Sequence, residues 1–178
     1  MLECPPMMKK LTSAALAVCF AFSVLVVSAS AAPQASTASS PKAAALNLYN
    51  VIKNQDWKAL YYITIFSAKV RADLPDDADQ FASGIAKGIK DSDPDGVVDK
   101  LFRSISDITI GEPVMNGNSA DVPTAANLTV SGKVIRFKGT AHMAKEKDVW
   151  KWDLSFTDDP QQATSVGIQN LLGKPDGQ

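Results

Sequence analysis

The chain has 178 residues, of which 46% are hydrophobic and 21% are charged, and its formal net charge is −1. This composition is typical of one ordinary globular domain with a short additional segment, and it argues against a disordered or a membrane-embedded protein. Basic residues are not in excess, so nothing in the composition points to nucleic-acid binding.

Residues 1–31 have the three-part layout of a secretory signal peptide. A pair of lysines precedes an apolar run over residues 11–27, and small residues follow this run. We place the cut after Ala31, because a cut one residue later would leave Pro33 at the unfavourable next position. The mature protein is therefore expected in the periplasm or outside the cell, with membrane contact only during export. An uncleaved anchor is the alternative, since membrane spans begin at roughly 18 apolar residues.

Both cysteines, Cys4 and Cys19, lie before this cut, so the mature chain is expected to contain no thiol. This excludes disulfides, zinc–thiolate sites and cysteine nucleophiles from the mature protein. Cys19 is a poor lipid-attachment site, because Val18 stands where a lipoprotein signal needs a small residue. Residues 32–40 are small and polar without periodicity, and they predict a flexible leader.

Helical signals come first in the mature chain. Ser40 is suited to cap a helix and Pro41 to open it, and the apolar stripe continues to about Lys53. A second helix is expected to begin after Asp56. The aromatic and β-branched residues 61–66 would suit a buried strand equally well.

A third helix is indicated by Phe81, Ile85 and Ile89, which follow one another at four-residue spacing. Gly84 and Gly88 lie within the same stretch. Glycine in a helix interior lowers stability, so these two residues either loosen the helix or let another backbone approach it closely.

Residues 91–99, with the sequence DSDPDGVVD, begin like a calcium-binding loop. Such a loop needs a bidentate acid at its twelfth position, which is Phe102 here. Pro94 restricts the loop further, because its ring fixes the backbone. We therefore favour a helix start in which Asp93 is the cap and Pro94 the first helical residue.

The hydrophobic period changes to two after residue 105. Apolar and polar residues alternate over 120–130, 135–143 and 150–156. Turn sequences separate these runs at 116–118, 131–132 and 145–148. The pattern predicts an α+β fold in which N-terminal helices pack on a curved four-stranded antiparallel sheet. Residues 159–178 are expected to add a short helix and a tail.

Two stretches resemble the nuclear transport factor 2-like superfamily. These are PKAAALNLYNVIKNQDWKALYYITIFSA, with its first helix leading through NQDW into an aromatic helix, and the final strand KDVWKWDLSF. The resemblance covers residues 41–158 and is closest to the secreted branch of small single-domain proteins. It implies helices and a curved sheet that form a cone, whose interior is a ligand pocket, an active site or a filled core; the fold leaves function open.

Five aromatic residues are the candidate ligand-binding residues, because they are expected to face the interior of this cone: Tyr49, Tyr61, Phe137, Trp150 and Trp152. Aromatic rings at inward positions are usually core residues, so a filled interior is the first interpretation of these five. Buried indole and phenol groups need hydrogen-bond partners, so a mixed pocket that holds a small apolar ligand is the alternative.

No catalytic constellation stands out. His142 shares its strand face with Arg136 and Lys138, the side expected to face solvent, and Asp121 and Asp153 also point away from the interior. One histidine with carboxylates is a poor set for zinc, so neither a metal nor a cofactor is expected. We therefore expect an exported, non-catalytic binding or interaction module. The alternatives are an isomerase- or dehydratase-type enzyme in the cone, and a homodimer through the Arg136–Lys138 sheet face.

Overall fold

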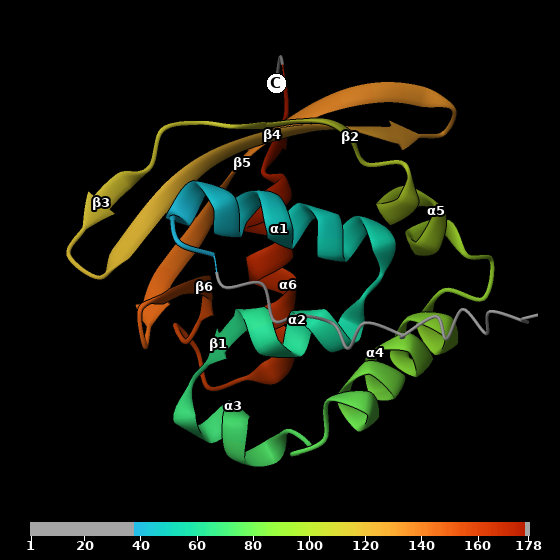
Figure 1. Cartoon of the computed structure of the whole chain (residues 1–178). Helices are drawn as coiled ribbons and strands as arrows, with labels where there is room; N and C mark the ends of the chain where they lie inside the picture. The colour runs from blue at the N-terminus through green and yellow to red at the C-terminus, as the bar shows by residue number, and fades with distance from the viewer. Residues whose placement is uncertain (1–37, 177–178) are drawn as a thin grey trace, which may run out of the picture. The chain divides into compact units, whose positions relative to one another are not determined.

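Six helices and seven strands make up the part of the chain that the structure, a computed structural model, describes, residues 38–176 (Figure 1). These residues belong to one compact unit. The expected signal peptide, its cut after Ala31 and most of the expected leader lie outside the described residues.

The helices are α1 (Pro41–Asn54), α2 (Trp57–Ile63), α3 (Ala68–Asp73), α4 (Ala78–Ser92), α5 (Val97–Arg103) and α6 (Pro160–Leu172). The strands are β1 (Thr64–Phe66), β2 (Ser106–Ile110), β3 (Val114–Asn116), β4 (Ser119–Val130), β5 (Lys133–Glu146), β6 (Val149–Leu154) and β7 (Lys174–Pro175).

The α+β class predicted from the sequence is confirmed, but the sheet is larger than the four antiparallel strands expected. Its order is β1-β6-β5-β4-β2, with β3 also paired to β4 and β7 to β5. Strands β2, β4, β5 and β6 are antiparallel neighbours, whereas β1 runs parallel to β6 and makes the sheet mixed. Strands β1, β3 and β7 have two or three residues each, which is too short for an alternating pattern to identify them.

Local capping signals placed the starts of α1 and α2 correctly. The Ser40 hydroxyl accepts a hydrogen bond from the Ala43 amide at 3.2 Å, and Pro41 is the first residue of α1. Asp56 caps α2 by accepting from the Ala59 amide at 2.9 Å. Residues 61–66 are part helix and part strand, because α2 ends at Ile63 and β1 begins at Thr64.

The predicted helix start at Asp93-Pro94 is wrong in its position. Helix α4 runs to Ser92, Asp93 is its C-terminal cap, and α5 begins only at Val97 after Gly96 in the left-handed conformation. Asp93 nevertheless serves α5, because its carboxylate accepts from the Val98 amide at 2.6 Å. In residues 38–176 no group of three or more His, Cys, Asp or Glu side chains is placed to hold a metal ion.

Helices α1 and α6 cover the inner face of the β4–β5 hairpin, which curves over them (Figure 1). Helix α6 lies close to β5, because a Cβ on Gly139 would stand 2.2 Å from the Leu171 carbonyl oxygen. Gly173, with a φ of 67°, ends α6 and lets the chain turn back along Lys138. Helix α6 and the turn that follows it are therefore part of the core packing.

A buried polar link joins α1, β4 and α6. The Tyr49 hydroxyl donates to the Leu171 carbonyl at 2.7 Å, and the Thr124 hydroxyl lies within 3.0 Å of both oxygens. Burial raises the pKa of the Tyr49 hydroxyl above its ordinary value, and the hydrogen bond with Thr124 offsets part of that rise. A buried hydroxyl without a partner would destabilise the fold, so this link is structural.

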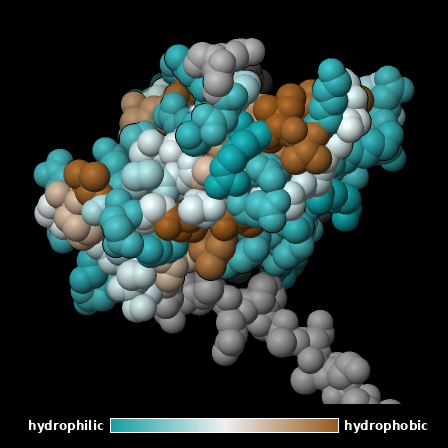
Figure 2. Space-filling view, turned by 90° about the horizontal axis from the view of Figure 1, so that it is seen from above, coloured by the Kyte–Doolittle hydropathy of each residue, from teal (hydrophilic) through white to brown (hydrophobic). Residues whose placement is uncertain are grey.

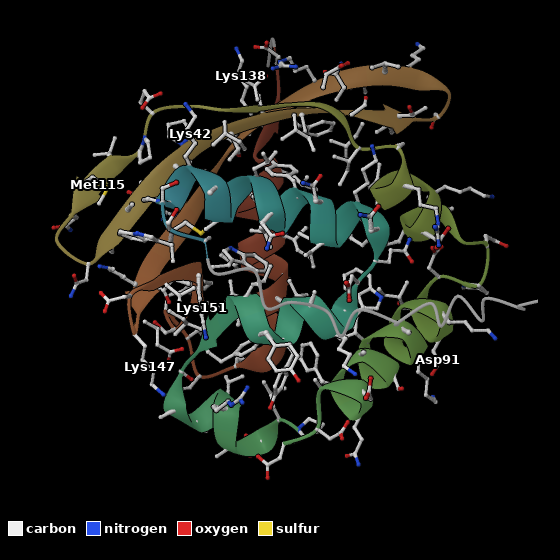
Figure 3. All side chains as sticks on the ribbon, in the orientation of Figure 1. Lys42, Asp91, Met115, Lys138, Lys147 and Lys151 are labelled. Carbon is white, nitrogen blue, oxygen red and sulfur yellow. The ribbon has the colours of Figure 1, made fainter. Side chains whose placement is uncertain are left out.

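The outer sheet face is charged and internally bonded. Arg136 donates to the Thr109 hydroxyl at 2.8 Å, and Lys138 forms an ion pair with Asp176 at 2.9 Å. His142 pairs with Asp121 at 2.5 Å on the same face. Lys138 points away from the helices (Figure 3), and the view from this side shows mainly hydrophilic surface with separate hydrophobic areas (Figure 2).

None of the helices described here is long and apolar enough to cross a membrane.

Candidate ligand-binding cavity

A cavity of about 650 Å³ lies between the helices and the β1–β6 end of the sheet. Its volume falls within the range of small-molecule sites. Every helix contributes to its wall, together with β1, β6 and the loop after α3: Ile52, Trp57, Leu60, Thr64, Phe66, Val70, Leu74, Pro75, Gln80, Phe81, Gly84, Ile85, Gly88, Ile89, Ser92, Val98, Phe102, Trp152, Leu154, Thr164, Ser165 and Ile168.

Helix α4 supplies one long side of the cavity. It is amphipathic, with Phe81, Ile85 and Ile89 on the cavity face and an ion pair between Lys87 and Asp91 in solvent. Asp91 extends away from the other helices (Figure 3). Helix α4 packs chiefly against α2, so its apolar face is only partly covered. The cavity is the space next to the uncovered part of that face.

Gly84 and Gly88 lie on this cavity face of α4. A Cβ added at either position would meet nothing within 4 Å. One interpretation of the sequence was that these glycines let another backbone approach the helix closely. The structure contradicts it, because no backbone lies near either glycine. Each lowers helix stability by about 1 kcal/mol relative to alanine. What the two glycines provide is room beside the helix.

The opposite wall is built on β6 and α6. Trp152 and Leu154 point inward from β6 and are buried. Their side chains lie directly against α6, because a Cβ on Gly167 would stand 2.4 Å from Leu154 Cδ2 and 2.7 Å from Trp152 Cζ2. Gly167 therefore seats the indole ring against the helix and fixes this side of the cavity.

Two aromatic contacts lie among the lining residues, and the cavity is open to solvent beside Gly84 and Gly88, which are exposed. Trp57 of α2 meets Phe102 of α5 edge to face, with ring centroids 6.0 Å apart. Phe66 meets Phe81 at 6.2 Å at the α3 end. Edge-to-face contacts of this kind stabilise apolar packing beyond simple burial, so they help to hold α2, α4, α5 and β1 around the cavity.

The lining side chains described above are uncharged. They include no Asp, Glu, His, Lys, Arg, Tyr or Cys, and the polar ones are hydroxyls, one amide and the two indoles. Three of the hydroxyls donate to carbonyls of their own segment: Thr64 to Leu60 at 2.7 Å, Ser92 to Gly88 at 2.8 Å and Ser165 to Gln162 at 3.3 Å. The lining is therefore largely apolar, with hydroxyl acceptors and the neutral donors of Gln80, Trp57 and Trp152.

Of the five aromatic residues predicted to bind a ligand, Trp152 alone lines this cavity. Tyr49 and Trp150 are buried in the main core, and Phe137 is partly buried against it. Tyr61 belongs to a second cluster with Phe81, and its hydroxyl donates to the backbone between α3 and α4. The structure does not bring the five side chains together.

The pocket expected from the sequence was at the inner face of the sheet, a different place from this cavity. That face is covered by α1 and α6, whereas the open space lies beside α4. The sequence feature that could have indicated this cavity is the pair Gly84 and Gly88 on an otherwise apolar helix face. Glycines inside a helix lower its stability, so two that no turn requires indicate that side chains are unfavourable at these positions for another reason.

No family model matches the chain, and no curated protein is significantly similar to it.

Proposed function

We propose that the protein is an exported, non-catalytic binding module that holds a small apolar ligand in the cavity beside α4. The observation that carries this proposal is a space of about 650 Å³ with a lining free of ionisable side chains. Such a lining favours apolar molecules, because a charged group placed there would lose its hydration without gaining an ionic partner. Export is inferred from the signal-peptide pattern of residues 1–31.

The lining also supports binding over proton-transfer chemistry. An isomerase or dehydratase needs a general base within hydrogen-bond reach of the reacting carbon, and the cavity walls offer only hydroxyl, amide and indole groups. The single His142 lies on the outer sheet face beside Asp121. The enzyme alternative is therefore the weaker of the two functions.

Membership of the nuclear transport factor 2-like superfamily is part of the same proposal. Helix α1 leads through a tight turn at Gln55, which has a φ of 56°, into α2. The antiparallel strands β2, β4, β5 and β6 would correspond to the four-stranded sheet of that superfamily. These features support the assignment at the level of topology, and function is argued from the cavity alone.

A dye titration tests the binding function. Nile red, an uncharged apolar dye, is added to the mature protein that begins after Ala31, and its emission is followed to saturation. The proposal predicts saturable binding of one dye molecule per chain. Val134→Ser is the control for surface adsorption, because Val134 is 66% exposed on the outer sheet face, and it should leave the titration unchanged. Non-saturable binding, or binding lost in Val134→Ser, would contradict the proposal.

A further inference from the structure

We propose that the ligand is an elongated, uncharged, chain-like molecule that lies along α4 and is seated against Gly84 and Gly88. This inference rests on the proposed binding function and names the chemical class of the ligand. It also makes the two glycines the residues that determine which ligands fit in the cavity.

The length of the cavity follows from its residues on α4. They run from Gln80 to Ser92, and at 1.5 Å per residue this stretch of helix is about 18 Å long. The two glycines lie within it, one turn apart, where side chains would otherwise project into the space. A chain-like ligand laid parallel to α4 would cross both of them.

The absence of charge in the ligand follows from the hydrogen-bonding state of the lining. Thr64, Ser92 and Ser165 use their hydroxyl hydrogens on carbonyls of their own segments, so their free capacity is that of acceptors. The donors in the lining are neutral, namely the Gln80 amide and the indoles of Trp57 and Trp152, and no Lys, Arg or His side chain lines the cavity. A buried carboxylate without a cation is unfavourable. An alcohol can donate its hydrogen to one of these oxygens, so a neutral hydroxyl is the polar group that this lining suits.

Decan-1-ol and decanoate make a matched pair of probes, because they share a chain and differ in the charge of the head group. Binding to the mature protein is followed by tryptophan fluorescence at pH 8. Trp57 and Trp152, two of the three tryptophans, line the cavity and report on its contents. We expect decan-1-ol to bind at least tenfold more tightly than decanoate.

Three leucine substitutions on α4 locate the ligand. Gly84→Leu and Gly88→Leu place a side chain in the open space of the cavity, and each should weaken decan-1-ol binding at least tenfold. Ser83→Leu adds the same side chain at an exposed position of α4 outside the cavity lining, and it should change the affinity less than twofold. Far-ultraviolet circular dichroism and the melting temperature establish that each variant is folded.

The outcomes separate the two levels of the argument. Equal binding of alcohol and acid, or unchanged binding in both glycine variants, overturns this inference and leaves an apolar binding module in place. Saturable Nile red binding without decan-1-ol binding also overturns it. Failure of the wild-type protein to bind Nile red, decan-1-ol and decanoate overturns the proposed function as well. If either glycine variant fails to fold, Gly88→Ala serves in its place, with a weaker loss of affinity expected.

Discussion

Replacing both α4 glycines with alanine should stabilise the protein. An added Cβ meets no atom within 4 Å at either position, so no clash opposes the gain in helix propensity. Glycine is about 0.8–1.0 kcal/mol less favourable than alanine in a helix interior. The Gly84→Ala/Gly88→Ala variant should therefore unfold with a free energy about 2 kcal/mol higher than that of the wild type, which raises Tm by roughly 6–8 °C.

Gly167→Ala is the matched control, since it makes the same change in another helix of the same unit. Its Cβ would lie 2.4 Å from Leu154 Cδ2 and 2.7 Å from Trp152 Cζ2. Overpacking of this kind costs about 1–3 kcal/mol, so this variant should be destabilised. Urea unfolding followed by circular dichroism measures all three proteins. If the α4 double variant is less stable than the wild type, the space beside α4 is filled and the cavity argument is wrong.

The remaining predictions concern the core, a helix cap and the outer sheet face. Burial raises the pKa of Tyr49, so the unfolded chain ionises first and stability should fall above about pH 10, with a slope approaching 1.4 kcal/mol per pH unit. Tyr49→Phe should be about 1 kcal/mol less stable at pH 7. Above pH 10 its free energy of unfolding, measured by urea unfolding at several pH values, should fall less steeply with pH than that of the wild type; equal slopes would refute this prediction. Asp93→Ala should lose about 1 kcal/mol through the α5 cap, and added calcium should leave the Tm of the wild type unchanged; a calcium-dependent rise would restore the loop hypothesis. A homodimer through the outer sheet face remains a prediction, and Arg136→Glu/Lys138→Glu should shift it to monomer in analytical ultracentrifugation; an unaffected dimer would place the interface elsewhere.

Local sequence signals predicted much of the secondary structure, because caps and turns act over a few residues. Ser40 and Asp56 cap the helices that follow them, and Ser131-Gly132, both with positive φ, form the β4–β5 turn. The period-two stretches became β4, β5 and β6. Phe156 was expected to continue the last strand, yet β6 ends at Leu154 and Phe156 is 51% exposed.

Features that depend on distant partners were not predictable in this way. Strand β1 is defined by pairing Thr64 with Trp152, which lies 88 positions later in the chain. Helix α3 has only six residues, too few for a periodic pattern. The cavity depends on how α4 stands relative to β6 and α6, and no local pattern encodes that distance. The inward direction of Trp152, which is buried, could be predicted because it follows from strand alternation alone.

The central claim, that the cavity beside α4 holds a ligand, is tested most directly by the native mass spectrum of protein purified from the exported fraction without added ligand. The account predicts an extra small mass on the folded protein that disappears on denaturation, and a denatured mass that corresponds to a chain beginning after Ala31. Gly88→Leu, prepared in parallel, should lack the extra mass. A native spectrum showing the bare polypeptide in both proteins would contradict the claim.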